Sequence, residues 1–313
     1  MRGTLIYIGQ RLVLISITTV LVSSIVFLLL HQIPGNAFLN ETRQSAQSIA
    51  AQLHHYGLDQ PLPQQYANWV AGVVHGNLGE SLVNRGVQIT PLLIRETSVS
   101  ATVGFFAILV TIGVGLLLGI IAALRQNTWV DYVASSTAVV GYSIPSFVLA
   151  ILGLLVFGHY FYVWTGGSVY YNPGWGDWTQ IPVPALALGL PYASYVARLT
   201  RASMLETIRT DYVRTAWAKG LKARAVVIRH ALRNALIPVV TILGPLVTGI
   251  ITGSVIIENI FGIPGLGKEF VTSILARDYN IVIGVFTFYA ALVGLANLTV
   301  DVIYPFLDPR IRY

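Results

Sequence analysis

Long runs without a charged residue are the feature that most limits what this chain can fold into. Residues 12–30 and 99–124 contain no Asp, Glu, Lys or Arg, and more apolar runs follow. A helix rises about 1.5 Å per residue, so about 20 apolar residues cross the hydrocarbon layer of a membrane. Hydrophobic residues make up 55% of the sequence and charged ones 10%, and the mean hydropathy is +0.69. A soluble domain carries about 25% charged residues, so the sequence predicts an integral membrane protein.

The apolar runs predict an all-α protein with six membrane-spanning helices and an outer segment between the first two. The predicted spans are residues 12–30, 99–124, 132–160, 181–197, 235–257 and 281–300. In the second span, Gly115 and Gly119 are spaced so that another helix can approach closely.

Prolines distinguish the third and fourth predicted spans. Pro145 removes a backbone hydrogen bond and should kink or break the third span. The fourth span contains Pro182, Pro184 and Pro191. A short, proline-interrupted span is tolerated only where protein or a water-filled path satisfies the freed backbone groups. We therefore expect the fourth span to lie beside the substrate route.

The basic residues predict the orientation of the chain, because Lys and Arg near membrane spans concentrate on the cytoplasmic side. Most of the 19 Lys and Arg residues lie in loops that six spans would place on one side, above all in residues 198–238. Both termini are then expected in the cytoplasm, with residues 12–30 as an uncleaved anchor. This segregation accounts for the net charge of +6 without nucleic acid as a partner, since the basic residues are not interleaved with stacking aromatics.

Residues 31–98 are expected on the outer side. Within them Tyr66, Trp69, Val70 and Val73 recur at helical spacing after two prolines, and predict an amphipathic helix. A helix with a single apolar face cannot span the membrane, so it should rest on the outer surface or against the spans.

A metal site is not favoured by the sequence. The adjacent residues His54 and His55 point about 100° apart on a helix, and no carboxylate or Cys completes a ligand set with them and His75. The chain has no Cys, which excludes a disulfide, a thiolate metal site and a Cys nucleophile.

The segment 198–238 carries the most specific pattern. It is rich in Lys and Arg, and its middle, residues 211–221, contains no proline and predicts a helix. Tyr212, Ala216 and Gly220 recur every four residues, so they should share one stripe of that helix. An aromatic anchor followed by two small residues lets another backbone approach, and we expect the stripe to contact a partner. The alternative is a solvated basic loop that only sets orientation.

The run DYVRTAWAKGL, followed by RHALRNALIPVVT, resembles the cytoplasmic coupling segment of bacterial ABC importer permeases, in particular the peptide and nickel branch. In that superfamily a short helix docks into a groove on the ATP-hydrolysing subunit. Arg214 and Thr215 stand where the general pattern has Glu and Ala, and the Pro after Gly220 is Pro238, later than in the general pattern. Both departures are similar to the peptide and nickel branch. The resemblance implies that coupling to the ATPase involves Tyr212, Arg214, Thr215, Ala216, Gly220 and Leu221.

The turn ENIFGIPGLGKEF, between the last two predicted spans, carries a second pattern. Residues 262–268 satisfy G-x-x-x-x-G-K, the start of a phosphate-binding loop, but Glu269 stands where a Ser or Thr would hold Mg²⁺. A carboxylate there would repel phosphate, so we do not expect ATP to bind. The turn instead resembles a feature of the peptide branch, which implies a re-entrant cap over the outer mouth. The matching residues are Glu258, Phe261, Pro264, Gly265 and Gly267.

The resemblance covers most of the chain and implies the transmembrane subunit of an ATP-driven importer that forms half of the path for oligopeptides or dipeptides. It also implies a second permease, two ATPase subunits that hold ATP and Mg²⁺, and an external solute-binding protein. No cofactor, metal or catalytic residue is expected in this chain, which should lie in the bacterial inner membrane. Residues 1–98 are expected to form an anchor helix and outer segment, and residues 99–313 a permease core.

Three alternatives stay open. A permease of the same fold could carry nickel or another small solute. A proton-coupled carrier would need ionisable groups deep in its spans, whereas Arg198, Glu258 and Asp301 lie near the ends of predicted spans. A membrane scaffold, whose basic loop recruits anionic lipid or a cytosolic protein, would show no substrate flux.

Overall fold

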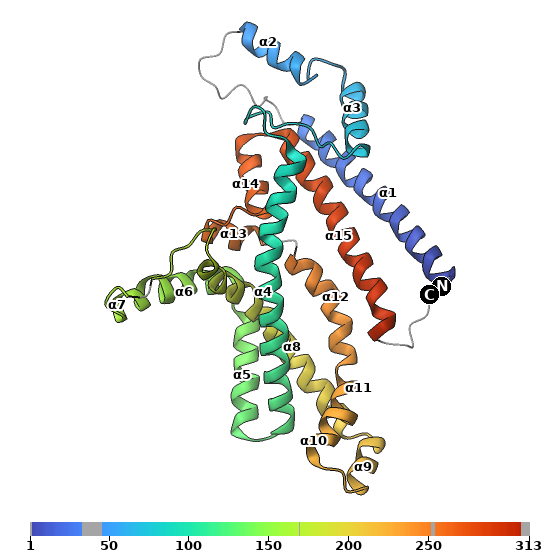
Figure 1. Ribbon diagram of the computed structural model, residues 1–313, viewed down its shortest axis with the longest axis vertical. Coiled ribbons are helices and arrows are strands. Elements are labelled where there is room, and N and C mark those ends of the chain that lie inside the picture. The colour runs from blue at the N-terminus through green and yellow to red at the C-terminus, as the bar shows by residue number, and fades with distance from the viewer. Residues whose placement is uncertain (1, 33–45, 169, 252–253, 308–313) are drawn as a thin grey trace. The chain divides into compact units, whose positions relative to one another are not determined.

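The computed structural model describes residues 2–32, 46–168, 170–251 and 254–307, and these are mostly helical (Figure 1). Within these ranges the extended pairing is an isolated bridge between Glu80 and Gln88, so the expected all-α fold is confirmed. The chain divides into two compact units. The first comprises residues 1–99 and 264–295, and the second comprises residues 100–263 and 296–313.

The first unit contains the outer segment. Its helices are α1 (Arg2–Gln32), α2 (Ala46–His55), α3 (Leu62–Val74), α14 (Leu266–Ala276) and the beginnings of α4 (Ile89–Leu124) and α15 (Tyr279–Leu307). Helix α3 is the predicted amphipathic helix and begins after Pro61. Its Tyr66 ring packs edge-on against Phe27 of α1, with 5.2 Å between ring centroids. The apolar core of this unit consists of Leu78, Ile89, Leu93, Leu266, Ile281 and Val285.

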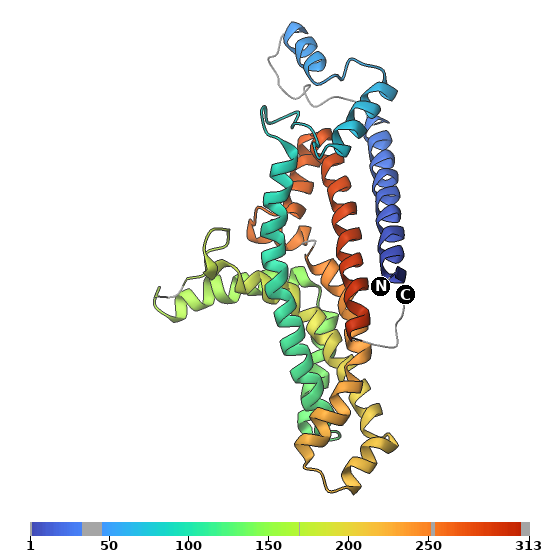
Figure 2. The same ribbon diagram turned by 45° about the vertical axis from the view of Figure 1, so that its right-hand side comes forward.

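The second unit is built around one long helix, α8, against which the rest of α4 and α5 pack (Figures 1 and 2). After the rest of α4, its elements in chain order are α5 (Trp129–Ser143), α6 (Ser146–Gly153), the π-helix η2 (Leu154–Tyr160), α7 (Phe161–Trp164), the 3-10 turn η3 (Trp178–Gln180), α8 (Pro182–Ile208), α9 (Asp211–Ala218), α10 (Ala223–Ala225), the π-helix η4 (Val226–Leu232), α11 (Arg233–Ala235), α12 (Ile237–Ile251), α13 (Val255–Phe261) and the end of α15.

Among the described residues, four helical stretches are long and apolar enough to cross a membrane. They are Leu5–Gln32, Ile89–Leu124, Ser146–Trp164 and Tyr279–Val302. A fifth is obtained if the pair Ala223–Ala235 and Ile237–Ile250, bent by 51°, is one span. The chain is therefore a multi-pass membrane protein, while the predicted number of six spans is not confirmed.

Prolines explain where the third and fourth predicted spans break or continue. Helix α5 ends before Ile144, which is extended, and Pro145 precedes α6, so the predicted break at Pro145 is confirmed. The prediction of an interrupted fourth span was wrong, because α8 is continuous over 27 residues. Pro182 and Pro184 lie in its first turn, where amide hydrogens have no intrahelical partner, and they therefore begin the helix.

The fifth predicted span, residues 235–257, is not one helix. Most of it is α12, which ends at Ile251, and Ser254 then caps the separate helix α13 by accepting a hydrogen bond from Ile257 N–H. The apolar pattern found the right residues but could not show this interruption.

Glycines bring α4 and α5 into close contact with α8. A Cβ added to Gly115 would lie 2.8 Å from the Val196 Cβ, and one added to Gly119 would lie 2.6 Å from the Thr200 Cβ. On α5, a Cβ added to Gly141 would lie 3.4 Å from the Ser194 Cβ. The helix approach predicted for Gly115 and Gly119 is thus confirmed, and its partner is α8.

We predict that Gly119→Ala destabilises the protein and that Gly113→Ala, on the same helix, does not. A Cβ at residue 119 would meet the Ala197 carbonyl oxygen at 2.6 Å, whereas nothing lies within 4 Å of one at residue 113. Overpacking costs about 1–3 kcal/mol, while Ala at an open helical position gains about 0.5–1 kcal/mol over Gly. Thermal unfolding of the purified variants should give a lower midpoint for Gly119→Ala alone. Equal midpoints would contradict the close contact.

Candidate functional site

A short helix, α9, follows directly from the end of α8. The turn between them contains Thr210, which has an extended backbone and whose hydroxyl donates a hydrogen bond to the Thr207 carbonyl oxygen at 2.6 Å. Only Arg209 and Thr210 separate the two helices.

One side of α9 packs onto η4. Val213 and Ala216, three residues apart on α9, are 0% and 4% exposed and pack with Val226 of η4. Tyr212 adds polar contacts to the same region, because its hydroxyl accepts a hydrogen bond from the Asn234 amide at 2.7 Å and donates one to the His230 carbonyl oxygen at 3.4 Å. Helix α9 is therefore held in place by its own chain.

The predicted stripe of Tyr212, Ala216 and Gly220 is not one exposed face, so this prediction was wrong. Ala216 is on the buried side of α9, and the helix ends at Ala218, before Gly220. The apolar contact with η4 decides which side of α9 faces inward. The exposed residues of α9 are Asp211, Tyr212, Arg214, Thr215, Trp217 and Ala218.

Gly220 ends this segment with a backbone that L-residues rarely adopt. Its φ is +73°, its N–H donates a hydrogen bond to the Trp217 carbonyl oxygen, and nothing lies within 4 Å of a Cβ built on it. Glycine adopts left-handed φ values without a steric penalty. Gly220 therefore terminates the turn after α9 and lies exposed beside Leu221, which is 40% exposed.

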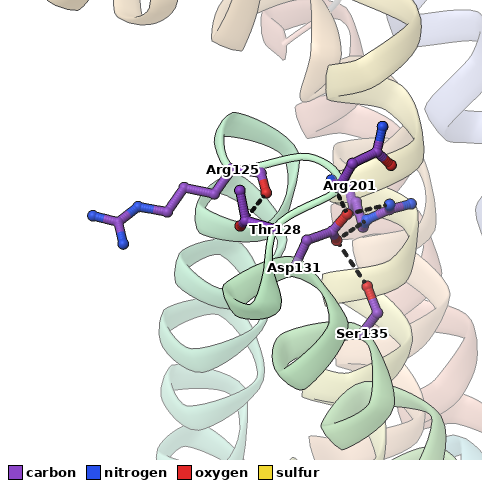
Figure 3. A network of polar contacts seen from close by, with 6 residues as sticks. Arg125, Thr128, Asp131, Ser135 and Arg201 are labelled. Carbon is purple, nitrogen blue, oxygen red and sulfur yellow. Dashed lines mark hydrogen bonds and ion pairs between the residues drawn. The ribbon is translucent and has the colours of Figure 1, made fainter.

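A buried ion pair links α8 to the turn between α4 and α5 (Figure 3). Asp131, in the first turn of α5, is 2% exposed, and the Arg201 side chain on α8 is 31% exposed. Arg201 donates two hydrogen bonds to the carboxylate, from Nε at 2.6 Å and from Nη2 at 2.8 Å. The Asn127 N–H and the Ser135 hydroxyl donate two more, at 3.0 and 3.1 Å.

These contacts keep Asp131 ionised. Hydrogen bonds from Arg201 outweigh the effect of burial and lower the pKa of Asp131 to about 2. The ordinary pKa of an Asp is about 3.9, so the pair contributes its full stability above that value and loses it only as the pH falls towards 2. Removing Arg201 would leave the Asp131 carboxylate buried without its partner, which is strongly destabilising for a buried charge.

Residues of the predicted outer turn divide between the two units. In the second unit, Glu258 is 2% exposed and accepts a hydrogen bond from the Ser100 hydroxyl at 2.7 Å. Phe261, 1% exposed, packs its ring edge-on against Tyr171. In the first unit, Pro264 is exposed and Gly265 and Gly267 are buried at the start of α14.

The side chains of two histidines in the outer segment each form a polar contact within their own chain. His54 contacts Asp59 at 2.8 Å, and His75 contacts the carbonyl oxygen of Ala71. Among the described residues, no group of three or more His, Cys, Asp or Glu side chains could hold a metal ion.

Sequence patterns missed the pair of Asp131 and Arg201. Asp131 directly precedes the third predicted span, and Arg201 lies in the basic segment 198–238. The available signal was the carboxylate of Asp131, next to a span whose glycines allow close helix packing. This signal does not indicate which basic residue of the segment 198–238 pairs with Asp131.

Known protein families and relatives match this chain over most of its length. Residues 115–313 match the family described as binding-protein-dependent transport system inner membrane component, and residues 4–89 match its N-terminal membrane component family. The chain is 39% identical over 307 residues to the dipeptide transport system permease protein DppB of Bacillus subtilis, covering 98% of this chain and 97% of that protein. It is 38% identical over 298 residues to the oligopeptide transport system permease protein OppB of Salmonella typhimurium, covering 95% of each.

Two solved structures share the fold. One is an amino acid ABC transporter, at 19% identity and a TM-score of 0.52, covering 71% of this chain and 95% of that one. The other is the MetNI methionine ABC transporter in an inward-facing conformation, at 21% identity and a TM-score of 0.53, covering 70% of this chain and 98% of that one. At these identities the likeness concerns the fold alone.

We predict that Gly220→Val loosens the end of α9 and that Gly220→Asn does so much less. Asn enters the left-handed region at little cost, while a β-branched residue is strained there. Lys219 and Lys222 flank the turn, so limited trypsin digestion measures its opening. Cleavage after these lysines should be faster in Gly220→Val than in Gly220→Asn and wild type. Equal rates in both variants would show that the backbone conformation of Gly220 is not what matters.

Proposed function

The chain belongs to the family of binding-protein-dependent transport system inner membrane components, and from this premise we propose that it is the membrane subunit of an ABC importer for peptides. The observation that carries the proposal is the similarity, over nearly the full length, to permeases named for dipeptide and oligopeptide transport. The family and the apolar helices indicate a multi-pass protein of the inner membrane.

The energy for transport would come from other chains. The sequence that most resembles a phosphate-binding loop, residues 262–268, is followed by Glu269 instead of Ser or Thr, and its first glycine caps the end of α13. We therefore assign ATP and Mg²⁺ to two separate ATPase subunits. A second permease would complete the path, and an extracytoplasmic solute-binding protein would deliver the peptide.

Helix α9 is the proposed contact with the ATPase. Arg214, Thr215 and Trp217 are exposed on its outer side, and Trp217, at 47% exposure, offers a large apolar surface. Trp and Arg are the residues most often responsible for affinity at protein interfaces.

The remaining residues of the predicted coupling set would support this contact. Tyr212 and Ala216 hold α9 on its own chain, while Gly220 and Leu221 form the exposed turn beyond it. The set therefore combines residues that would touch the partner with residues that position them.

The outer turn is proposed as a cap over the outer mouth of the path. It would comprise Glu258, Phe261, Pro264, Gly265 and Gly267. Support comes from the buried hydrogen bond of Glu258 and the left-handed Gly262 that turns the chain there.

The proposed topology has both termini in the cytoplasm. It follows from the basic residues of the segment 198–238, which would lie on the same side as α9. Within that topology, residues 1–98 would form the anchor and outer segment, and residues 99–313 the permease core.

Reconstitution tests the proposed function. The chain would be placed in lipid vesicles with the second permease, the ATPases and the solute-binding protein of its own transport system, with ATP supplied on the ATPase side. We expect labelled dipeptides or oligopeptides to accumulate only when ATP and the ATPases are present. Uptake of Ni²⁺ without peptide uptake would change the substrate. Uptake that needs no ATPase and collapses with an uncoupler would identify a proton-coupled carrier, and absence of any flux would favour a scaffold.

We predict that Trp217→Ala and Arg214→Glu each weaken association with the ATPases. Truncating an interface anchor of this kind costs about 2 kcal/mol or more, which is over tenfold in affinity. The yield of ATPase that copurifies with the tagged permease measures the effect. Arg85→Glu is the matched control, because Arg85 is also exposed but is expected on the outer side. Unchanged yields for both α9 variants would contradict docking at α9.

A further inference from the structure

We propose that Asp131 and Arg201 are positioning residues for ATP coupling, because their ion pair makes the α4–α5 turn follow α8 when α9 is displaced. The inference rests on the proposed function and adds to it a route by which movement of α9 reaches α4 and α5. Neither residue belongs to the coupling motif or to the outer turn.

The first step in the argument is the position of Arg201 on α8. Helix α8 is continuous from Arg201 to Ile208 and is followed by α9 after two residues. Arg201 therefore lies on the rigid segment nearest to α9, and any rotation or shift of this end of α8 displaces its guanidinium group.

The second step is the geometry of the ion pair. Two parallel hydrogen bonds from one guanidinium fix orientation as well as distance. The carboxylate is also bonded to the Asn127 N–H and the Ser135 hydroxyl, so it is fixed both to the turn before α5 and to α5 itself. A pull on Arg201 is thus transmitted to the backbone of the α4–α5 turn (Figure 3).

The third step is the packing along the rest of α8. Gly115 and Gly119 of α4 and Gly141 of α5 lie so close to α8 that an added Cβ would touch it. The Thr111 hydroxyl of α4 also donates a hydrogen bond to the Gly189 carbonyl oxygen at 3.1 Å. Sliding α8 past its neighbours would break these contacts, since packed interfaces are not continuously deformable. The ion pair adds a polar link to this contact in the half of α8 that leads to α9.

A cross-link tests whether α5 and α8 move together. The chain has no Cys, so the double variant Gly141→Cys with Ser194→Cys contains only the two introduced cysteines. A Cβ on Gly141 would lie 3.4 Å from the Ser194 Cβ, close to the separation of about 3.5–4.5 Å in disulfides. We expect ATP-driven peptide uptake by the reconstituted complex to be similar with the pair oxidised and reduced. Loss of uptake on oxidation, restored by dithiothreitol, would overturn the proposal, because the interface would then have to open.

Asp131→Asn tests the ion pair itself and does not depend on disulfide formation. Coupling between distant sites is typically about 5- to 150-fold, so we expect peptide uptake per ATP hydrolysed to fall by about fivefold or more. ATPase binding should be retained, because α9 is unchanged. Glu206→Gln is the matched control, since Glu206 is an exposed carboxylate on α8, the helix of Arg201, and it should leave the ratio unchanged.

The ratio of uptake to hydrolysis separates positioning from stability. A purely structural defect lowers uptake and hydrolysis together, through the amount of intact complex, and would overturn the proposal. Arg201→Lys keeps the charge without the paired donors and should recover part of the ratio lost in Arg201→Gln. The double variant Asp131→Asn with Arg201→Gln should be no worse than either single variant. If the wild-type complex itself shows no ATP-driven peptide uptake, the proposed function has failed; an active wild type with an unchanged ratio in Asp131→Asn defeats only this inference.

Discussion

The contact of α8 with α4 and α5 is the interaction on which the second unit depends. Helices in lipid gain little from burying apolar side chains against one another, since lipid tails are equally apolar, and they associate through close packing and hydrogen bonds. Glycines at residues 115, 119 and 141 provide the packing, and the Thr111 hydroxyl provides a hydrogen bond to the backbone of α8. Near the end of α8, the bidentate pair of Arg201 and Asp131 adds a charged contact to this packing.

Features determined by local chemistry could be predicted from the sequence. The amphipathic pattern located α3, the missing N–H of Pro145 located the break after α5, and the glycine spacing located a helix contact on α4. Pro182 and Pro184 gave the wrong result because a proline that would interrupt the interior of a helix can begin one in its first turn, whereas Pro191 lies inside the continuous helix α8. Position within the helix decides between these outcomes, and a hydropathy pattern does not fix where a helix begins.

Features determined by tertiary contact could not be predicted. Which side of α9 faces inward depends on Val226, which lies in the following element and packs on Val213 and Ala216. The pairing of Asp131 with Arg201 joins residues 70 positions apart, and residues 198–238 contain several other basic side chains of similar character. In both cases the contacting residue is distant in the sequence or one of several similar residues, so the three-dimensional structure is needed to identify it.

The small residues of the coupling motif have explanations within this chain. Ala216 lies on the side of α9 that packs on η4, where a larger side chain would push the helix away. Gly220 is needed for the left-handed turn that follows α9. Contact with a partner protein is therefore not required to explain why these two residues are small. The two small residues therefore seat α9 and end it, while Arg214, Thr215 and Trp217 of α9 are exposed.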